Sequence, residues 1–309
     1  MPNRKEFYFP SSDGKTQIHA IEWAPDAEPV GVYQIAHGVS EYALRYEPFA
    51  EFLNGKGFVV VANDHLGHGQ SVAEGAPALY FGEKDGWTHV VDDMYALRNL
   101  TAQKHPDLPY FLMGHSMGSF LTRTYLIRYP GTVGAAIIMG TGQQAGYMVA
   151  GGRAAAKIIG KKHGFDQFNE TVNHLAFGAY NKPFEPKRTD YDWLSANEEN
   201  VDKYIADPLC GGGATTGLFL EMLGGIGFIG KPSNLAKMDK NTPILFISGA
   251  MDPVGDLGKG ATKAYESFKK AGVKDVELKL YPGLRHEILN EKEKDQVYAD
   301  LWAWIEKHL

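Results

Sequence analysis

Short runs of consecutive apolar residues alternate along this chain with longer stretches in which apolar residues recur at helical spacing. Runs that are apolar on successive residues are typical of strands buried on both faces of a parallel sheet. Six such runs stand at residues 30–37, 58–63, 110–114, 134–139, 243–248 and 276–281. Amphipathic helical patterns cover residues 46–56, 90–104, 119–129, 262–271 and 293–308. The alternation predicts an α/β fold with a mostly parallel, doubly wound sheet and right-handed crossovers.

Two stretches near the start of the chain alternate apolar and polar residues instead, at 6–9 and 17–23. The sequence Ser12-Asp13-Gly14 lies between them and is rich in turn-forming residues. These stretches therefore predict an antiparallel hairpin.

The alternation of strands and helices stops between residues 141 and 238. This segment has helical patterns at 153–162 and 166–175 and clustered glycines at 211–213 and 224–230, without a convincing buried strand. We therefore expect a core made of residues 1–140 and 239–309, with a helical cap inserted at 141–238. Open α/β sheets bind ligands beyond the carboxyl ends of their strands, where such a cap would cover the site.

The composition and charge of the chain limit the kinds of partner and the cellular compartment that we expect. A chain of 309 residues with 44% hydrophobic content buries a sizeable core, and a net charge of −6 without a basic block argues against nucleic acid. The single cysteine, Cys210, excludes an internal disulfide and favours a reducing compartment. The N-terminus has no apolar leader, and no apolar run is long enough to span a bilayer. We expect a soluble, cytoplasmic protein without integral membrane association; oligomeric state is not set by these features.

The candidate nucleophile is Ser116, which stands in Gly114-His115-Ser116-Met117-Gly118. This Gly-x-Ser-x-Gly pattern follows an apolar run and precedes a helical pattern that ends before Pro130. Strand, sharp turn and helix in this order are typical of a nucleophile elbow, where small glycines allow strand and helix to approach closely. The alternative is that Ser116 merely caps the helix.

A serine nucleophile needs a general base, and the base needs an acid that orients it. Asp252 follows the run at 243–248, and His286 follows the run at 276–281. Both therefore lie just past the carboxyl end of a strand, at the same rim of the sheet as Ser116. Asp256 is the second candidate for the acid, and His115 is expected to be a packing residue because it neighbours the nucleophile.

Two backbone N–H groups are candidates to stabilise an oxyanion. The N–H of Met117 stands at the start of the helix after Ser116, and the N–H of Val39 follows the glycine of His37-Gly38. This chemistry requires no cofactor and no metal. His65 and His68 are spaced like metal ligands but lack a third ligand, so a hydrogen-bonded loop is expected there.

The stretch 225–232 imitates nucleotide-binding motifs. No strand precedes it, and Pro232 stands where a phosphate loop needs a hydroxyl side chain. We expect flexible cap backbone there. Cys210 has no base partner in the sequence and is interpreted as a small apolar residue.

Taken together, these residues resemble the α/β-hydrolase superfamily, and within it the group of monoacylglycerol lipases, lysophospholipases and S33 serine aminopeptidases. The resembling segments are residues 37–46, 64–71, 114–118, 207–209, 249–254 and 285–291. The resemblance implies Ser116, His286 and Asp252 as the triad, Val39 and Met117 as oxyanion donors, and a cap that forms an apolar acyl pocket.

The same resemblance points to Glu41, Tyr42 and Arg45 as candidate substrate-binding residues. Monoacylglycerol lipases have a histidine at the position that Tyr42 occupies, whereas Glu41 and Arg45 keep the places they have in that group. The departure at Tyr42 bears on how a glycerol head group would be recognised.

The sequence thus predicts a serine hydrolase that cleaves carboxylic esters through an acyl-enzyme, with lipid-like esters slightly favoured over small ones. An S33-type aminopeptidase is the alternative, because four acidic residues of the predicted cap could gather a substrate amine: Asp190, Asp192, Glu198 and Glu199. A ligand-binding protein without turnover on the same fold is a third possibility. It would be recognised by a missing triad member or oxyanion glycine, and this sequence has all of them.

Overall fold

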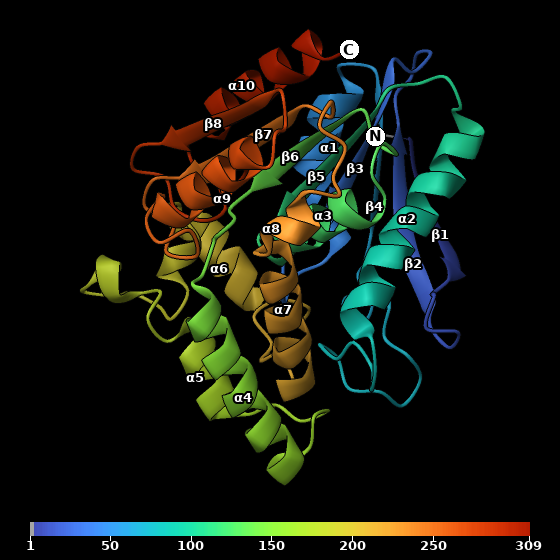
Figure 1. The fold of residues 1–309 in the computed structure, drawn as a ribbon. Coiled ribbons are helices and arrows are strands. Elements are labelled where there is room, and N and C mark those ends of the chain that lie inside the picture. The colour runs from blue at the N-terminus through green and yellow to red at the C-terminus, as the bar shows by residue number, and fades with distance from the viewer. Residues whose placement is uncertain (1–2) are drawn as a thin grey trace.

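A single eight-stranded sheet organises the chain in the computed structural model, which describes residues 3–309 (Figure 1). Its strand order is β1-β2-β4-β3-β5-β6-β7-β8, and β1 and β2 run antiparallel to their neighbours while all other pairs are parallel. The strands are β1 Asn3–Pro10, β2 Gln17–Ala24, β3 Gly31–Ala36, β4 Phe58–Asn63, β5 Tyr110–His115, β6 Ala135–Met139, β7 Ile244–Gly249 and β8 Val276–Tyr281. The predicted α/β fold and its N-terminal hairpin are confirmed.

Helices cover both faces of the sheet, because successive residues of its central strands are apolar. In β4, Val59 and Val61 face one hydrophobic core while Val60 and Ala62 face the other. One core contains side chains of α2 (Gly86–Lys104), α3 (Met117–Arg128) and α9 (Lys259–Lys270), and the other contains those of α1 (Glu47–Asn54) and α10 (Lys294–Lys307). The doubly wound arrangement follows from this two-sided burial.

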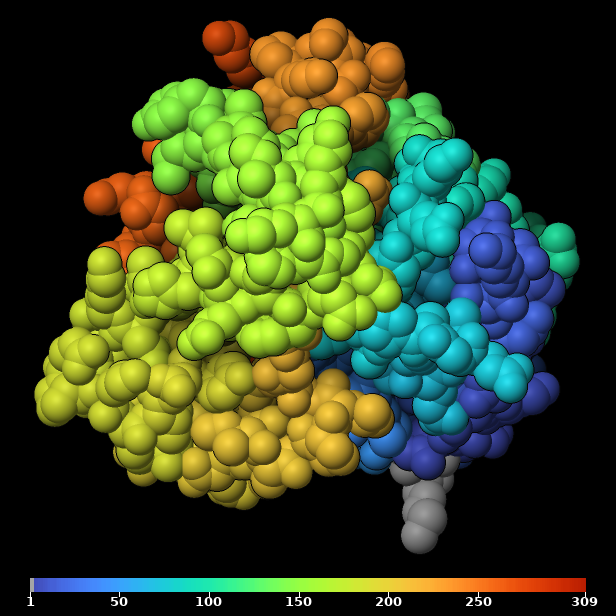
Figure 2. Space-filling view, turned by 90° about the horizontal axis from the view of Figure 1, so that it is seen from below, coloured from blue at the N-terminus to red at the C-terminus, as the bar shows by residue number. Residues whose placement is uncertain are grey.

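The segment between β6 and β7 contributes helices and no strand to the sheet. Its helices are α4 Gly146–His163, α5 Glu170–Phe177, α6 Glu198–Ala206, α7 Thr216–Ile229 and α8 Pro232–Leu235. α4 and α5 form the lower end of the molecule in Figure 1, and α7 packs against α2, α3 and α4. Seen from below, this segment covers much of that face (Figure 2).

The flexible backbone expected at residues 225–232 is wrong. Most of this stretch belongs to the buried helix α7, which continues to Ile229. Its glycines allow close packing: a Cβ added to Gly225 would lie 2.1 Å from Cε2 of Trp87, and one added to Gly217 would lie 2.8 Å from the carbonyl oxygen of Phe165. The contacts that these glycines permit outweigh their low helix propensity. None of the helices in the described part of the chain has the length and apolar character needed to cross a bilayer.

Candidate active site

Ser116 occupies a sharp turn between β5 and α3. Its φ of 54° and ψ of −120° are strained for a residue with a side chain. Hydrogen bonds hold the turn, because the Ser116 N–H donates to the carbonyl of Met139 at 3.0 Å and the Ser119 N–H donates to the carbonyl of Ser116 at 2.9 Å. Ser116 is partly exposed, whereas all other residues from 110 to 120 are buried. The turn thus presents this one side chain at the surface of the core.

The two glycines of the motif are required by close contacts. A Cβ added to Gly114 would lie 2.1 Å from the carbonyl oxygen of Gly118, and one added to Gly118 would lie 2.0 Å from the carbonyl oxygen of Ala36. Atoms at these separations overlap strongly, so strand β5, helix α3 and the end of β3 can meet only without those side chains. The close approach predicted from the motif is confirmed.

The candidate acid and base are hydrogen-bonded to each other. The Nδ1–H of His286 donates to Oδ2 of Asp252 at 2.9 Å, and both residues are buried. Asp252 also accepts hydrogen bonds from the N–H of Val254 at 2.9 Å and from the hydroxyl of Ser248 at 3.2 Å. Among the described residues, Asp256 forms no hydrogen bond with His286. The arrangement leaves Nε2 of His286 available as a base.

His286 lies next to the elbow that carries Ser116. The ring of His115 is 4.6 Å from that of His286 between centroids, and its Nε2 lies 3.3 Å from the His286 carbonyl oxygen. A Cβ added to Gly140 would come within 3.1 Å of His286 Cε1, so the chain after β6 also passes along the ring. The Trp193 ring also lies near, 5.2 Å from that of His286 between centroids.

The loop after β3 passes beside the nucleophile. A Cβ added to Gly38 would lie 3.1 Å from Cβ of Ser116. Within residues 3–309, neither the N–H of Val39 nor that of Met117 donates a hydrogen bond to another protein group. An oxyanion hole requires unused backbone donors of this kind near the nucleophile.

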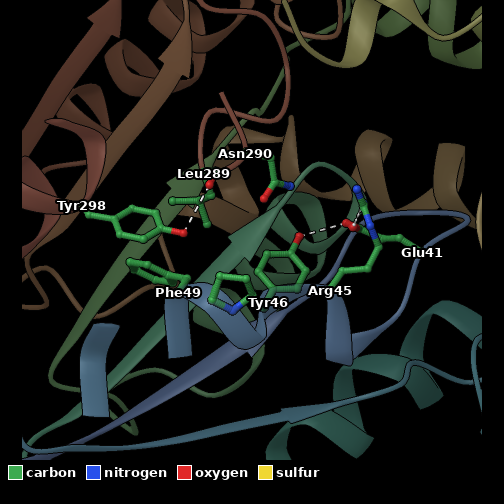
Figure 3. A pocket seen from close by; sticks show the side chains of 8 residues that line it. Glu41, Arg45, Tyr46, Phe49, Leu289, Asn290 and Tyr298 are labelled. Carbon is green, nitrogen blue, oxygen red and sulfur yellow. Dashed lines mark hydrogen bonds and ion pairs between the residues drawn. The ribbon is translucent and has the colours of Figure 1, made fainter. Parts of the chain in front are cut away.

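A buried ionic network joins this loop to the residue after His286. Arg45 donates to Glu41 Oε2 at 2.6 Å and to both carboxylate oxygens of Glu287 at 2.8 and 2.9 Å. Figure 3 shows Arg45 and Tyr46 directed at the Glu41 carboxylate, and the Tyr46 hydroxyl donates to Glu41 Oε1 at 2.8 Å. The same view shows a small pocket whose lining also includes Leu289.

The charges of this network determine the pKa values of its members. Burial by itself raises the pKa of Glu41, but the hydrogen bond with His115 and the charge of Arg45 hold that pKa well below its ordinary value. Burial likewise opposes ionisation of Glu287, yet Arg45 lowers its pKa. The hydrogen bond to Glu41 raises the pKa of His115 in spite of burial. His115 is thus a member of the network as well as a packing residue, which the sequence did not indicate.

The three residues expected to bind substrate have protein partners for their polar groups. Glu41 and Arg45 pair with each other, and the Tyr42 hydroxyl donates to Oδ2 of Asp207 at 2.7 Å. Glu287 and Trp193 were not singled out from the sequence, and His115 was expected only to pack. The only available signal was that Glu287 and His115 adjoin triad candidates.

His65 and His68 lie in a hydrogen-bonded loop, as expected, and they are buried beside His37. Burial lowers the pKa of His68 to about 3 and that of His65 well below its ordinary value, so both rings are neutral at pH 7. Burial also raises the pKa of the Cys210 thiol, as expected of an unreactive apolar residue. In the described chain, Asp275, Glu277 and His308 form a group whose possible metal-ligand atoms lie within 4.8 Å of one another. These side chains have protein partners, because His308 is hydrogen-bonded to Asp275 and Glu277 forms an ion pair with Lys307.

Comparisons with known proteins show the family to which the chain belongs. The family model described as serine aminopeptidase, S33, matches residues 27–293. The monoacylglycerol lipase of Mycolicibacterium smegmatis is 32% identical over 307 residues, which are 99% of this chain and 98% of that protein. The monoglyceride lipase of Homo sapiens is 28% identical over 92% of this chain and 84% of its own.

Solved structures show the same similarity. A highly thermostable carboxyl esterase from Bacillus coagulans, determined in complex with glycerol, has a TM-score of 0.91 and 27% identity, with 98% of each chain covered. The sheet described above is therefore that of an α/β hydrolase. Because the family model spans most of the chain and the Mycolicibacterium lipase is similar along almost its whole length, this chain belongs to the serine aminopeptidase S33 family of α/β hydrolases.

Proposed function

We propose that the protein is a serine hydrolase that cleaves carboxylic esters. His286 Nε2 takes the proton of the Ser116 hydroxyl, and the oxygen attacks the ester carbonyl carbon. The N–H groups of Val39 and Met117 stabilise the oxyanion. Collapse of the tetrahedral intermediate breaks the ester bond, and the departing alkoxide receives the proton from His286. Water then attacks the acyl-enzyme with the help of the same base and releases the acid.

The observation that carries this proposal is the hydrogen bond between His286 Nδ1 and Asp252, 2.9 Å long and buried, beside a strained Ser116. A neutral imidazole whose Nδ1–H is held by a carboxylate has its lone pair on Nε2, which is the protonation state that a general base needs. The strained turn fits the nucleophile better than a simple helix cap, because the Ser116 side chain accepts no capping hydrogen bond.

We further propose monoacylglycerol-like lipid esters as the substrate class and residues 141–238 as a cap over the acyl chain. Aromatic rings continue from His286 into this segment: Trp193 stacks with Phe177 at 6.3 Å, and Phe177 lies 5.4 Å from Phe219. An apolar wall beside the base suits an acyl chain. The relatives named above are lipases and an esterase, which supports the same class.

The aminopeptidase alternative is weaker on electrostatic grounds. Asp190 pairs with Lys187 at 2.6 Å, and Glu199 pairs with Lys203 at 2.8 Å. Asp192 accepts hydrogen bonds from the backbone N–H groups of Arg188 and Thr189. These three carboxylates already have protein partners, so Glu198 alone of the four has no side-chain hydrogen bond or ion pair among the described residues, and a single carboxylate is a weak site for a substrate amine.

We propose that Glu41 and Arg45 influence the substrate indirectly, by holding the oxyanion loop, because their charges are already paired within the protein. Tyr42 is partly exposed and is the one of the three that we propose to contact the alcohol portion of the ester.

The test combines active-site labelling with a substrate panel. A fluorophosphonate probe should label the wild type and not Ser116→Ala, and equal labelling of the two would refute the nucleophile assignment. Asp252→Asn should lower kcat by about 10⁴-fold because the imidazole loses its orienting partner. The matched variant Asp256→Asn should change it by less than about threefold. Monoacylglycerols, p-nitrophenyl esters of increasing chain length and an aminoacyl anilide then separate lipase, esterase and aminopeptidase.

A further inference from the structure

His37 uses both of its ring nitrogens inside the protein. The residue is completely buried, its Nδ1 lies 2.7 Å from the carbonyl oxygen of Gly38, and its Nε2 lies 2.8 Å from the backbone nitrogen of His65. A peptide N–H can only donate, so Nε2 of His37 must carry the lone pair. The proton therefore resides on Nδ1, which donates to the Gly38 carbonyl.

That hydrogen bond acts on the peptide unit that contains a proposed oxyanion donor. The carbonyl of Gly38 and the N–H of Val39 belong to one planar, trans peptide, in which the two groups point in opposite directions. Fixing the carbonyl toward His37 therefore fixes the Val39 N–H away from His37. A rotation of this peptide would instead turn a carbonyl oxygen toward the nucleophile, where it would repel an oxyanion.

The preceding peptide unit is fixed as well. The N–H of Gly38 donates to Oε1 of Glu41 at 2.5 Å, and the Glu41 carboxylate is held by Arg45 and Tyr46. His37 and Glu41 therefore hold two successive peptide units of the same loop. His37 binds the carbonyl of Gly38, and Glu41 binds the N–H of Gly38.

The surroundings of His37 keep its ring in one place and one charge state. The ring lies 4.1 Å from that of His65 and 5.3 Å from that of His68. Burial lowers the pKa of His37, with Arg45 acting in the same direction and Glu41 and Asp64 opposing it. The ring is therefore neutral at pH 7, as its two hydrogen bonds require.

We infer that His37 is a positioning residue for the oxyanion hole: its Nδ1–H orients the Gly38–Val39 peptide so that the Val39 N–H faces the reacting carbonyl. This inference rests on the proposed esterase function. It assigns a role to a buried histidine that takes no part in proton transfer. Since removal of one oxyanion donor costs about 10²- to 10³-fold in kcat, misorientation of this peptide should cost a comparable factor.

Two substitutions separate the hydrogen bonds of His37. In His37→Asn the side-chain amide N–H can replace Nδ1–H and keep the bond to Gly38, whereas the bond to His65 is lost. In His37→Gln the longer side chain can replace Nε2 as acceptor for His65 and leaves the Gly38 carbonyl without its donor. Both replace a ring by an amide, so each serves as the other's control for packing loss.

We expect His37→Gln to lower kcat for p-nitrophenyl butyrate about 10²-fold with KM within about threefold, and His37→Asn to retain kcat within about tenfold. A trifluoromethyl ketone, which forms a tetrahedral adduct with its oxygen in the oxyanion hole, should lose affinity in proportion to kcat/KM across the series. Equal kcat in two folded variants, or an inhibitor constant that does not follow kcat/KM, would overturn the role of His37. If the wild type neither hydrolyses the ester nor reacts with the fluorophosphonate, the proposed function itself has failed.

The protonated nitrogen can be identified without any substitution. In protein labelled with ¹⁵N-histidine, the His37 signals should report Nδ1–H and a bare Nε2 at pH 7. The opposite tautomer would contradict the inference even if neither variant folds.

Discussion

Arg45 donates two parallel hydrogen bonds to the carboxylate of the buried residue Glu287, at 2.8 and 2.9 Å. This bidentate geometry is the strongest form of an arginine–carboxylate contact. Glu287 follows His286 directly, and Arg45 lies in the segment after the oxyanion loop. The pair therefore couples two loops that the proposed mechanism needs at a fixed separation.

Removing the charge of Glu287 should destabilise the protein strongly. Glu287→Gln leaves Arg45 with one carboxylate partner in place of two, and the loss of charge-assisted hydrogen bonds should cost about 1.5–3 kcal/mol. Urea unfolding measures this. The matched control is Glu277→Gln, whose ion pair with Lys307 has side chains 44% and 60% exposed and should be worth less than about 1 kcal/mol. Equal losses of unfolding free energy in the two variants would show that the buried ion pair contributes no more to stability than the exposed one.

A single methyl group at Gly118 should prevent the elbow from forming. Its Cβ would lie 2.0 Å from the carbonyl oxygen of Ala36 and 2.6 Å from that of His37, both backbone atoms. We expect Gly118→Ala to lose more than about 3 kcal/mol of stability and to react with fluorophosphonate at least about 100-fold more slowly. Gly151→Ala is the control, because Gly151 lies inside α4 with no neighbour within 4 Å of an added Cβ, and it should gain about 0.5–1 kcal/mol. Thermal melts and labelling rates distinguish the two, and a Gly118→Ala protein as stable and reactive as the wild type would contradict the steric argument.

The sequence was most informative where the relevant physics is local. Runs such as that at 58–63 predicted buried strands because alternate residues face two cores, and β4 has those bounds. Asp252 and His286 could be selected because each follows a strand by a few residues, and parallel strands end at one rim of the sheet.

Prediction from the sequence failed where the structure depends on contacts between residues that are distant in the chain. Arg45 and Glu287 are 242 positions apart, and no local pattern links them. Helix α7 was missed because its glycines weaken the helical pattern, whereas in the fold they allow Trp87 to pack closely. Helix α6 was missed because only Val201 and Tyr204 of its nine residues are buried, so its apolar stripe is too sparse to read.

His19 should make stability depend on pH above neutrality. Its Nδ1 lies 2.9 Å from Asp64 Oδ2 and its Nε2 lies 3.1 Å from Glu6 Oε2. Burial opposes protonation, but the two carboxylates outweigh it and raise the pKa of His19. A histidine whose pKa is higher in the folded than in the unfolded state stabilises the fold when it is protonated. This stabilisation is complete below the unfolded-state pKa of about 6.5 and is lost as the pH rises through the folded-state pKa.

We therefore expect His19→Gln to cost about 2 kcal/mol at pH 6 and clearly less at pH 9. Denaturant unfolding of both proteins at the two pH values gives the difference directly, and subtraction cancels the titration of groups that the two proteins share. A difference that grows between pH 6 and pH 9 would contradict a positively charged His19 between two carboxylates.

Arg123 should control the start of the segment between β6 and β7. This arginine of α3 is completely buried, and no carboxylate in residues 3–309 forms an ion pair with it. It donates instead to the carbonyl of Gly142 at 2.9 Å, to the hydroxyl of Thr141 at 3.3 Å and to the side-chain oxygen of Gln143. Burial lowers the pKa of Arg123 to about 9, so the guanidinium stays charged at pH 7. An unpaired buried charge is costly, which makes its hydrogen bonds to this connection difficult to replace.

Replacing Arg123 by methionine should loosen that connection while preserving packing volume. We expect the amides of residues 141–145 to exchange hydrogen about tenfold faster in Arg123→Met, because the carbonyl of Gly142 loses its partner. Arg98→Met is the control: Arg98 donates to the carbonyl of Thr132 at 2.8 Å, so its loss should affect exchange near Thr132 and leave residues 141–145 unchanged. If this connection also carries the proposed cap, Arg123→Met should lower kcat/KM more for long-chain than for short-chain esters. If exchange at residues 141–145 is unchanged in a folded Arg123→Met protein, contacts other than those of Arg123 hold this connection.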